Sequence, residues 1–405
     1  MMTRQSKALL CLCFCLISIG CLLLTRYHTG LATVAFTISG LGTGIVPLIR
    51  EKQETSSAGR WPVSAGYVVY LVSFIIITNW VTNVFRVHIA SSPIEQMTDM
   101  LLVLREMCDR YIAHQPVYTP ISDIYGMPIQ VVYLPGFFLP FSIPVALHID
   151  MRWISLLAFA VAIFSLVVVR RSAFTPGHIL IVIAVAAFTY LLTAGAAFYF
   201  MHTQEAIVLL YVGVLAWALI NEYWFAAGIA AASCLMSRYF IFIPLSAGLG
   251  WLYVYHRAAA YRAVAGVIAS VLVLLSVSRT WGDLPHFIQI PLLYKDLLTD
   301  DKSIGAFRHV YQGSVGFAWF CGMHTLHIVR GINLAIIVII PLGYFAMAGR
   351  YLRAVPPGIV ILCGLQIFLV CFLTTLPLPF GYVLYTSAFL SIFMIKASLE
   401  ARKSK

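Results

Sequence analysis

The ionisable side chains that could do chemistry in this chain stand beside its apolar runs. Asp99 follows the third apolar run and lies near the start of an amphipathic stretch at residues 94–114, and Arg238 lies between two apolar runs. A carboxylate can take up a proton, and a cation at membrane depth is costly unless it is paired or at an interface, which makes it a functional candidate. Each residue also has a simpler explanation. Asp99 could only favour the N-terminal dipole of its helix, and Arg238 could only extend to lipid phosphates.

Two other polar segments could contribute to a site. The turn at residues 202–205 ends on Glu205, which could pair with Arg238 as a structural contact or line a pocket. A late stretch adds side chains able to hydrogen-bond a sugar or a phosphate, although each taken singly is more often a solvated loop residue. These side chains are Trp281, Asp283, His286, Lys295, Asp296, Arg308, His309, Tyr311 and Gln312.

The sequence lacks the short motifs of soluble nucleotide-binding and zinc enzymes. There is no GxGxxG after a strand, no GxxxxGK[ST], no HExxH and no CxxC pair. Most cysteines lie in or beside apolar runs, where cysteine behaves as a small hydrophobe. Cys108 and Cys321 are the exceptions and could form a disulfide. We therefore expect neither a metal nor a cofactor.

The elements that must position these residues are membrane helices. Hydrophobic residues make up 61% of the 405 residues and charged residues only 10%, a balance that would expose large apolar patches in water. Crossing the hydrocarbon core takes about 20 apolar residues. The sequence predicts an all-α polytopic protein with twelve spans near residues 8–25, 31–49, 62–82, 151–169, 177–197, 205–220, 223–237, 239–256, 262–278, 331–349, 357–375 and 380–396.

The basic residues indicate the orientation of these spans. The net charge of +11 is scattered over span ends, so it argues against nucleic-acid binding. With a cytoplasmic N-terminus, the positive-inside rule is satisfied and both termini lie in the cytoplasm. The inner basic residues are then Arg4, Lys7, Arg50, Lys52, Arg60, Arg152, Arg170, Arg171, Arg257, Arg262, Arg350, Arg353, Lys396, Arg402, Lys403 and Lys405.

Two long outer stretches, residues 83–150 and 279–330, interrupt the spans and hold most of the acidic residues. The apolar positions of residues 94–114 recur at helical spacing, which predicts an amphipathic helix on the membrane surface. Residues 131–149 are apolar enough to span, but Pro135, Pro140 and Pro144 are expected to break a helix there. We therefore expect a re-entrant segment or partial crossing.

Three segments resemble the GT-C superfamily of membrane glycosyltransferases, specifically the family 87-like mannosyltransferase relatives. The first begins at Asp99, runs through Tyr111-Ile-Ala-His-Gln-Pro-Val-Tyr118 and ends on Tyr133-Leu-Pro-Gly-Phe-Phe-Leu-Pro140; here His114 stands where Gly is usual and Gly136 replaces a second Pro. The second runs from Gln204 to Arg262, with Arg238 where relatives commonly have Lys. The third, the weakest match, is Tyr311–Gly316. The resemblance covers residues 60–400.

The resemblance implies a division of the chain and a reaction. Residues 1–60 would be an N-terminal transmembrane hairpin, and 61–405 the catalytic domain. A hexose or pentose, with mannose favoured, would pass with inversion from a polyprenyl phosphate to a lipid or glycan acceptor at the outer face of the cytoplasmic membrane. Asp99 would be the general base, and Arg238 would bind the lipid phosphate. Further substrate-binding candidates are Tyr118, His202, Gln204, His309, Tyr311 and Gln312.

Two other functions fit a polytopic basic chain. A transporter or lipid-glycan flippase would keep its site near the midplane and often show repeats, neither of which the sequence indicates. An enzyme like the O-antigen ligases or polymerases would rely on Arg308 and His309 more than on Asp99. The sugar, the acceptor and the oligomeric state are left open by the sequence.

Overall fold

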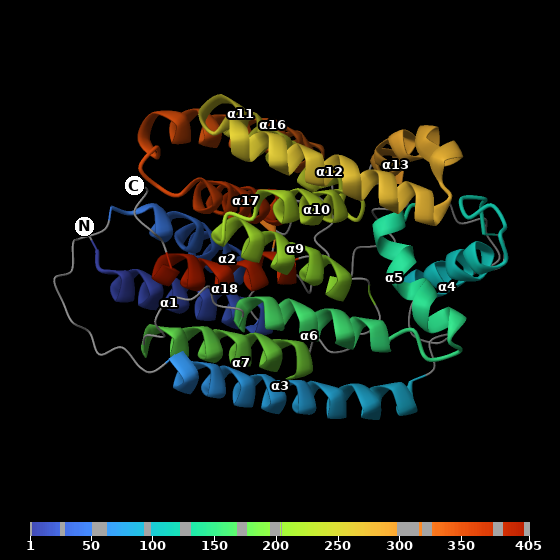
Figure 1. Cartoon of the computed structure of the whole chain (residues 1–405), viewed down its shortest axis with the longest axis horizontal. Coiled ribbons are helices and arrows are strands. Elements are labelled where there is room, and N and C mark those ends of the chain that lie inside the picture. Colours follow the sequence, from blue (N-terminus) through green and yellow to red (C-terminus); the bar gives the residue numbers. More distant parts are fainter. Residues whose placement is uncertain are drawn as a thin grey trace.

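The computed structural model describes residues 2–24, 29–50, 63–92, 99–121, 131–167, 176–194, 203, 205–297, 316–317, 326–375 and 384–400, and all regular elements among them are helical. Helices of different lengths run side by side to form the body of the protein (Figure 1). They are α1 (Arg4–Leu24), α2 (Thr29–Ile45), α3 (Val63–Ser91), α6 (Trp153–Val167), α7 (Ile179–Ala194), α9 (Glu205–Ile220), α10 (Trp224–Leu235), α11 (Phe242–Tyr255), α12 (Arg257–Ser278), α16 (Leu326–Tyr351), α17 (Pro357–Thr374) and α18 (Leu384–Glu400).

Three further helices, α4 (Asp99–Ile112), α5 (Pro135–Ala146) and α13 (Leu284–Leu297), gather at one end of the bundle, which we call the loop end (Figure 1). The start of α1 and the last turns of α18 lie together at the opposite end, the terminal end, where Cys11 Sγ contacts Ser398 Oγ. The short 3₁₀ turns are η1 (Val46–Leu48), η3 (Pro176–His178), η4 (Tyr239–Ile241) and η5 (Trp281–Asp283).

Each of the twelve predicted apolar runs coincides with a helix, so the all-α membrane class is confirmed. Over the described residues, six of these helices are long and apolar enough to cross a bilayer: α1, α2 with η1, α3, α12, α16 and α17. The others are shorter, and α10, with twelve residues, rises only about 18 Å. The crossing of the membrane by all twelve, and the orientation of the termini, stay predictions.

The packing separates a core from a lipid-facing rim. The described residues of α18 and almost all of α17 are buried, which places these two helices at the centre. Large apolar side chains of α3, α12 and α16 are exposed, as expected where the surrounding solvent is hydrocarbon. The α1–α2 pair packs against α17 and α18, so the predicted N-terminal hairpin is part of the bundle.

Glycine lets α10 and α12 approach closely. A Cβ atom on Gly228 of α10 would overlap the carbonyl of Ala263 in α12, and one on Gly266 of α12 would overlap the carbonyl of Phe225. Small residues at a crossing allow this backbone contact, which stabilises membrane helices through dispersion instead of the hydrophobic effect. The short helix α10 is thus held mainly by α12.

Two predictions about the outer and inner sides disagree at Arg152. The sequence placed Arg152 among the inner basic residues, yet it lies at the loop end, 2% exposed, where its Nη1 donates to the carbonyl of Ser92 (2.6 Å) after the end of α3. Asp150 neutralises it through a 2.6 Å ion pair. Arg152 therefore shares the side of residues 83–150, the stretch predicted to be outer, and the two predictions cannot both hold.

Candidate functional site

The centre of the loop end is an ion pair between Arg238 and Glu205. After α10 the chain turns, and the turn is held by the carbonyl of Cys234. This carbonyl accepts hydrogen bonds from the Arg238 amide (2.8 Å) and the Ser237 hydroxyl (2.7 Å). Arg238 then takes an extended conformation, and its Nη2 pairs with Oε1 of Glu205, the first residue of α9. The Arg238 side chain is 17% exposed and that of Glu205 is 1% exposed. The sequence had left this pairing open, and the structure confirms it.

The start of α5 covers this pair. The Gly136 amide donates to the carbonyl of Met236, at 3.0 Å, and a Cβ on Gly136 would lie 2.6 Å from the same oxygen. The ring of Phe137 faces the Arg238 guanidinium, with 5.3 Å between ring centroid and Cζ. Gly136 is therefore the residue that lets α5 dock on the Arg238 turn.

The expected breaks in residues 131–149 do not occur, because α5 runs unbroken through Pro140 and Pro144. Pro135 stands at the start of the helix, where its missing amide costs nothing. Pro140 has no amide to offer the carbonyl of Gly136, and the hydroxyl of Tyr211 in α9 donates to that carbonyl instead, at 2.7 Å. A partner distant in the sequence therefore supplies the hydrogen bond that proline removes.

Tyr118 is buried between α5 and α13. Its hydroxyl donates to the carbonyl of Tyr133 (2.9 Å), and its ring lies 5.3 Å from that of His286. Burial raises the pKa of the Tyr118 hydroxyl well above its ordinary value, and the charges of Tyr239 and Asp283 add to this. Tyr118 therefore stays a neutral hydrogen-bonding group between the Arg238 turn and the start of α13.

Asp283 and His286 form a second polar group; the sequence analysis named both as possible hydrogen-bonding residues but did not choose them for the substrate site. His286 donates from Nε2 to the carbonyl of Val131 (2.9 Å), which anchors α13 to the first outer stretch. Partial burial raises the pKa of the Asp283 carboxyl, and the charge of His286 opposes that rise. The two residues are one helical turn apart, a spacing that could have signalled the pair.

Asp99 begins α4, as predicted, and its carboxylate lies outside the described side chains. The apolar face of α4 packs against protein instead of lying on lipid, because Leu104 and Met107 are fully buried in contact with the core that includes α5. Tyr111 ties the end of α4 to α12 by donating to the carbonyl of Val277 (2.9 Å). The helix that carries Asp99 is thus fixed to the element that covers Arg238.

Cys108 does not form the disulfide considered from the sequence. It is a buried free thiol that contacts the carbonyl of Phe138 at 3.4 Å, and burial raises its pKa. Cys321, its considered partner, lies outside the described residues. The remaining predicted substrate-binding residues also lie outside them; these are His202, Gln204, His309, Tyr311 and Gln312. Of the predicted site residues, the structure therefore brings Tyr118 and Arg238 near each other: Tyr118 contacts Phe138 and Arg238 contacts Phe137, which are adjacent in α5.

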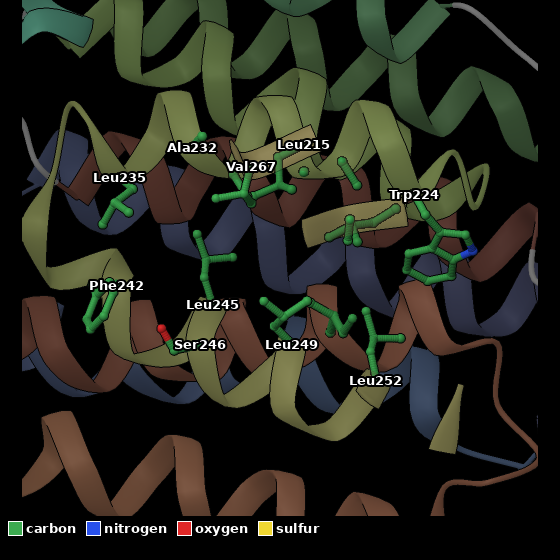
Figure 2. A pocket seen from close by; sticks show the side chains of 16 residues that line it. Leu215, Trp224, Ala232, Leu235, Phe242, Leu245, Ser246, Leu249, Leu252 and Val267 are labelled. Carbon is green, nitrogen blue, oxygen red and sulfur yellow. The ribbon is translucent and has the colours of Figure 1, made fainter. Parts of the chain in front are cut away.

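An apolar cavity of about 210 Å³ lies between α9, α10, α11, α12 and α17. Figure 2 shows Leu235 and Phe242 near one end and Trp224 and Leu252 near the other, so the cavity follows the helices. Ser246 contributes a hydroxyl to a lining that is otherwise almost entirely carbon. With no ionisable group in its lining, this cavity is suited to a hydrocarbon chain and not to acid–base chemistry.

Within the described part of the chain, no three His, Cys, Asp or Glu residues are grouped as metal ligands would be. Comparison of the sequence with family models and curated proteins, and of the fold with solved structures, finds no match. Function must therefore be inferred from the chemistry of the loop end.

Proposed function

We propose that this protein is a membrane glycosyltransferase that transfers a sugar from a polyprenyl phosphate to a lipid or glycan acceptor at the outer face of the cytoplasmic membrane. The observation that carries the proposal is Arg238, a partly exposed guanidinium at the bundle end, 5.3 Å from the Phe137 ring. A guanidinium offers several donors in a planar fork that matches phosphate oxygens. Polyprenyl phosphate combines such a phosphate group with a long apolar chain that is soluble in the hydrocarbon layer of the membrane.

In the proposed reaction, an acceptor hydroxyl attacks the anomeric carbon as the bond from that carbon to the phosphate oxygen breaks. Asp99 takes the hydroxyl proton, and the phosphate leaves with the bonding electrons as polyprenyl phosphate. Arg238 stabilises the charge that grows on this leaving group. The anomeric configuration is inverted because the displacement occurs once.

Other features of the loop end support this reaction. Tyr118, Asp283 and His286 supply neutral and charged hydrogen-bonding groups next to the Arg238 turn, as recognition of sugar hydroxyls requires. The apolar cavity begins at Leu235 and Phe242, within a few residues of Arg238, and could receive part of a hydrocarbon chain.

The test is transfer from a radiolabelled polyprenyl-phosphate sugar by membranes that contain the full chain. Asp99→Asn is expected to lower transfer by about 10²–10⁴-fold, the range of a lost general base. Asp109→Asn is the matched control, because Asp109 is an exposed carboxylate on the same helix. Undiminished transfer by Asp99→Asn would rule out its role as base, and loss with Arg308→Ala alone would favour an enzyme like the O-antigen ligases.

A further inference from the structure

Glu205 neutralises Arg238, the residue proposed to bind the donor phosphate. Its carboxylate pairs with the Arg238 guanidinium and is 1% exposed, so water does not screen the contact. A donor phosphodiester carries one negative charge, the same as this carboxylate. Two anions close together in a poorly solvated site repel each other strongly.

The geometry points to Glu205 as the resident counter-ion of Arg238, which the lipid phosphate must displace when the donor binds. This inference rests on the proposed function and assigns a positioning role to a residue that no other argument has placed in the reaction. Glu205 holds the guanidinium in the unloaded site and yields that place to the phosphate.

The surroundings of the pair favour exchange over a permanent bond. Arg238 lies in a turn between α10 and η4, is 17% exposed, and borders the Phe137 ring, so the guanidinium can be reached from the loop end. Glu205 is the first residue of α9. The unpaired amides and the dipole at this helix start stabilise its carboxylate when Arg238 binds the lipid phosphate instead.

A buried ion pair kept only for stability would behave differently. Removal of one partner then leaves an uncompensated charge, which destabilises the fold and weakens every property that depends on it. If Glu205 competes with the donor, its neutralisation strengthens phosphate binding even when it reduces stability. The two roles therefore predict opposite changes in affinity.

The experiment measures binding of radiolabelled polyprenyl phosphate, without sugar, to the full chain in nanodiscs of neutral phosphatidylcholine. We expect Glu205→Gln to bind about tenfold more tightly than the natural protein, since loss of one like charge should be worth at least one decade of affinity. Glu222→Gln, a change of the same type at an exposed residue of the α9–α10 turn, is expected to leave affinity unchanged. Arg238→Gln is expected to abolish binding.

Glu205→Asp keeps the inference testable if Glu205→Gln does not fold, since the shorter carboxylate retains the charge near α9 but recedes from Arg238. It should also tighten binding. Equal or weaker binding by the folded variant would overturn the inference. If Glu205→Gln binds polyprenyl phosphate more tightly but the natural protein transfers no sugar, the proposed function alone is overturned. If the natural protein transfers sugar but Glu205→Gln binds the lipid with unchanged affinity, only the role of Glu205 is overturned.

Discussion

Lys396 and Arg238 are both cations inside this bundle, but the contacts described for them are with different kinds of group. Lys396, near the terminal end, is fully buried, and its Nζ donates to the carbonyls of Leu166 (2.9 Å) and Ser165 (3.3 Å) in the last turn of α6. Carbonyl oxygens at the C-terminal end of a helix carry its negative dipole, which favours a nearby cation. Arg238, at the loop end, is partly exposed and pairs with the side chain of Glu205.

The difference separates a structural cation from a candidate binding group. Backbone carbonyls at the end of a packed helix cannot leave Lys396 without unwinding α6. A carboxylate side chain can rotate away from Arg238 without loss of secondary structure. Burial and charge alone therefore do not identify a functional cation in a membrane bundle, and the nature of its partner does.

The largest effect on the Arg238 side of this comparison is expected from Gly136→Ala. The added methyl group would meet the Met236 carbonyl at 2.6 Å, so α5 or the Arg238 turn must shift. Overpacking of this kind costs about 1–3 kcal/mol, and we expect at least about a tenfold loss of sugar transfer. Gly250→Ala is the control, since a Cβ there meets no atom within 4 Å. Normal transfer by Gly136→Ala would show that the α5 contact is not needed.

On the other side, Lys396→Met should reduce the free energy of unfolding by about 2 kcal/mol, because two buried carbonyls lose a charged donor. Binding of polyprenyl phosphate by the folded fraction should not change. Thermal unfolding in detergent and the nanodisc binding measurement check the two parts. A selective loss of lipid binding would mean that Lys396 is not purely structural.

Tyr211→Phe should cost about 1 kcal/mol of stability, since the Gly136 carbonyl loses its donor beside Pro140. Tyr190→Phe is a matched change on a ring that is 54% exposed, and it should leave the unfolding temperature unchanged. If both variants unfold at the same temperature as the natural protein, another group must satisfy the Gly136 carbonyl.

The smallest effect is expected from Asp283→Asn, and it depends on pH. The raised pKa of Asp283 in the folded protein means that its stabilising contribution is complete below the unfolded value, near 3.8, and is lost as pH rises through the folded pKa. At neutral pH, Asp283→Asn should therefore unfold at a slightly higher temperature than the natural protein. The advantage should vanish in acid; an advantage that grows in acid would contradict the assigned shift.

Local sequence features were enough to find the helices, because runs of about 20 apolar residues have few other stable forms in lipid. The start of α4 at Asp99 was also foreseen, and the pairing of Glu205 with Arg238 was one of the two alternatives that the sequence left open, because adjacent apolar runs bring their ends together. Continuity of α5 was not foreseen, since the hydroxyl that compensates for Pro140 belongs to Tyr211 in another helix. Asp283 was named only as one of several polar residues of the late stretch, because its partial burial depends on packing by α13 against the first outer stretch.

The close crossing of α10 and α12 has a consequence for biosynthesis. At about 18 Å, α10 is much shorter than the roughly 30 Å hydrocarbon core, and the helix that fits against its glycine face is made after α11. We expect a nascent chain that ends after α11 to hold α10 loosely in the membrane. Stable insertion of α10 would then wait until the ribosome has delivered Gly266 and the rest of α12.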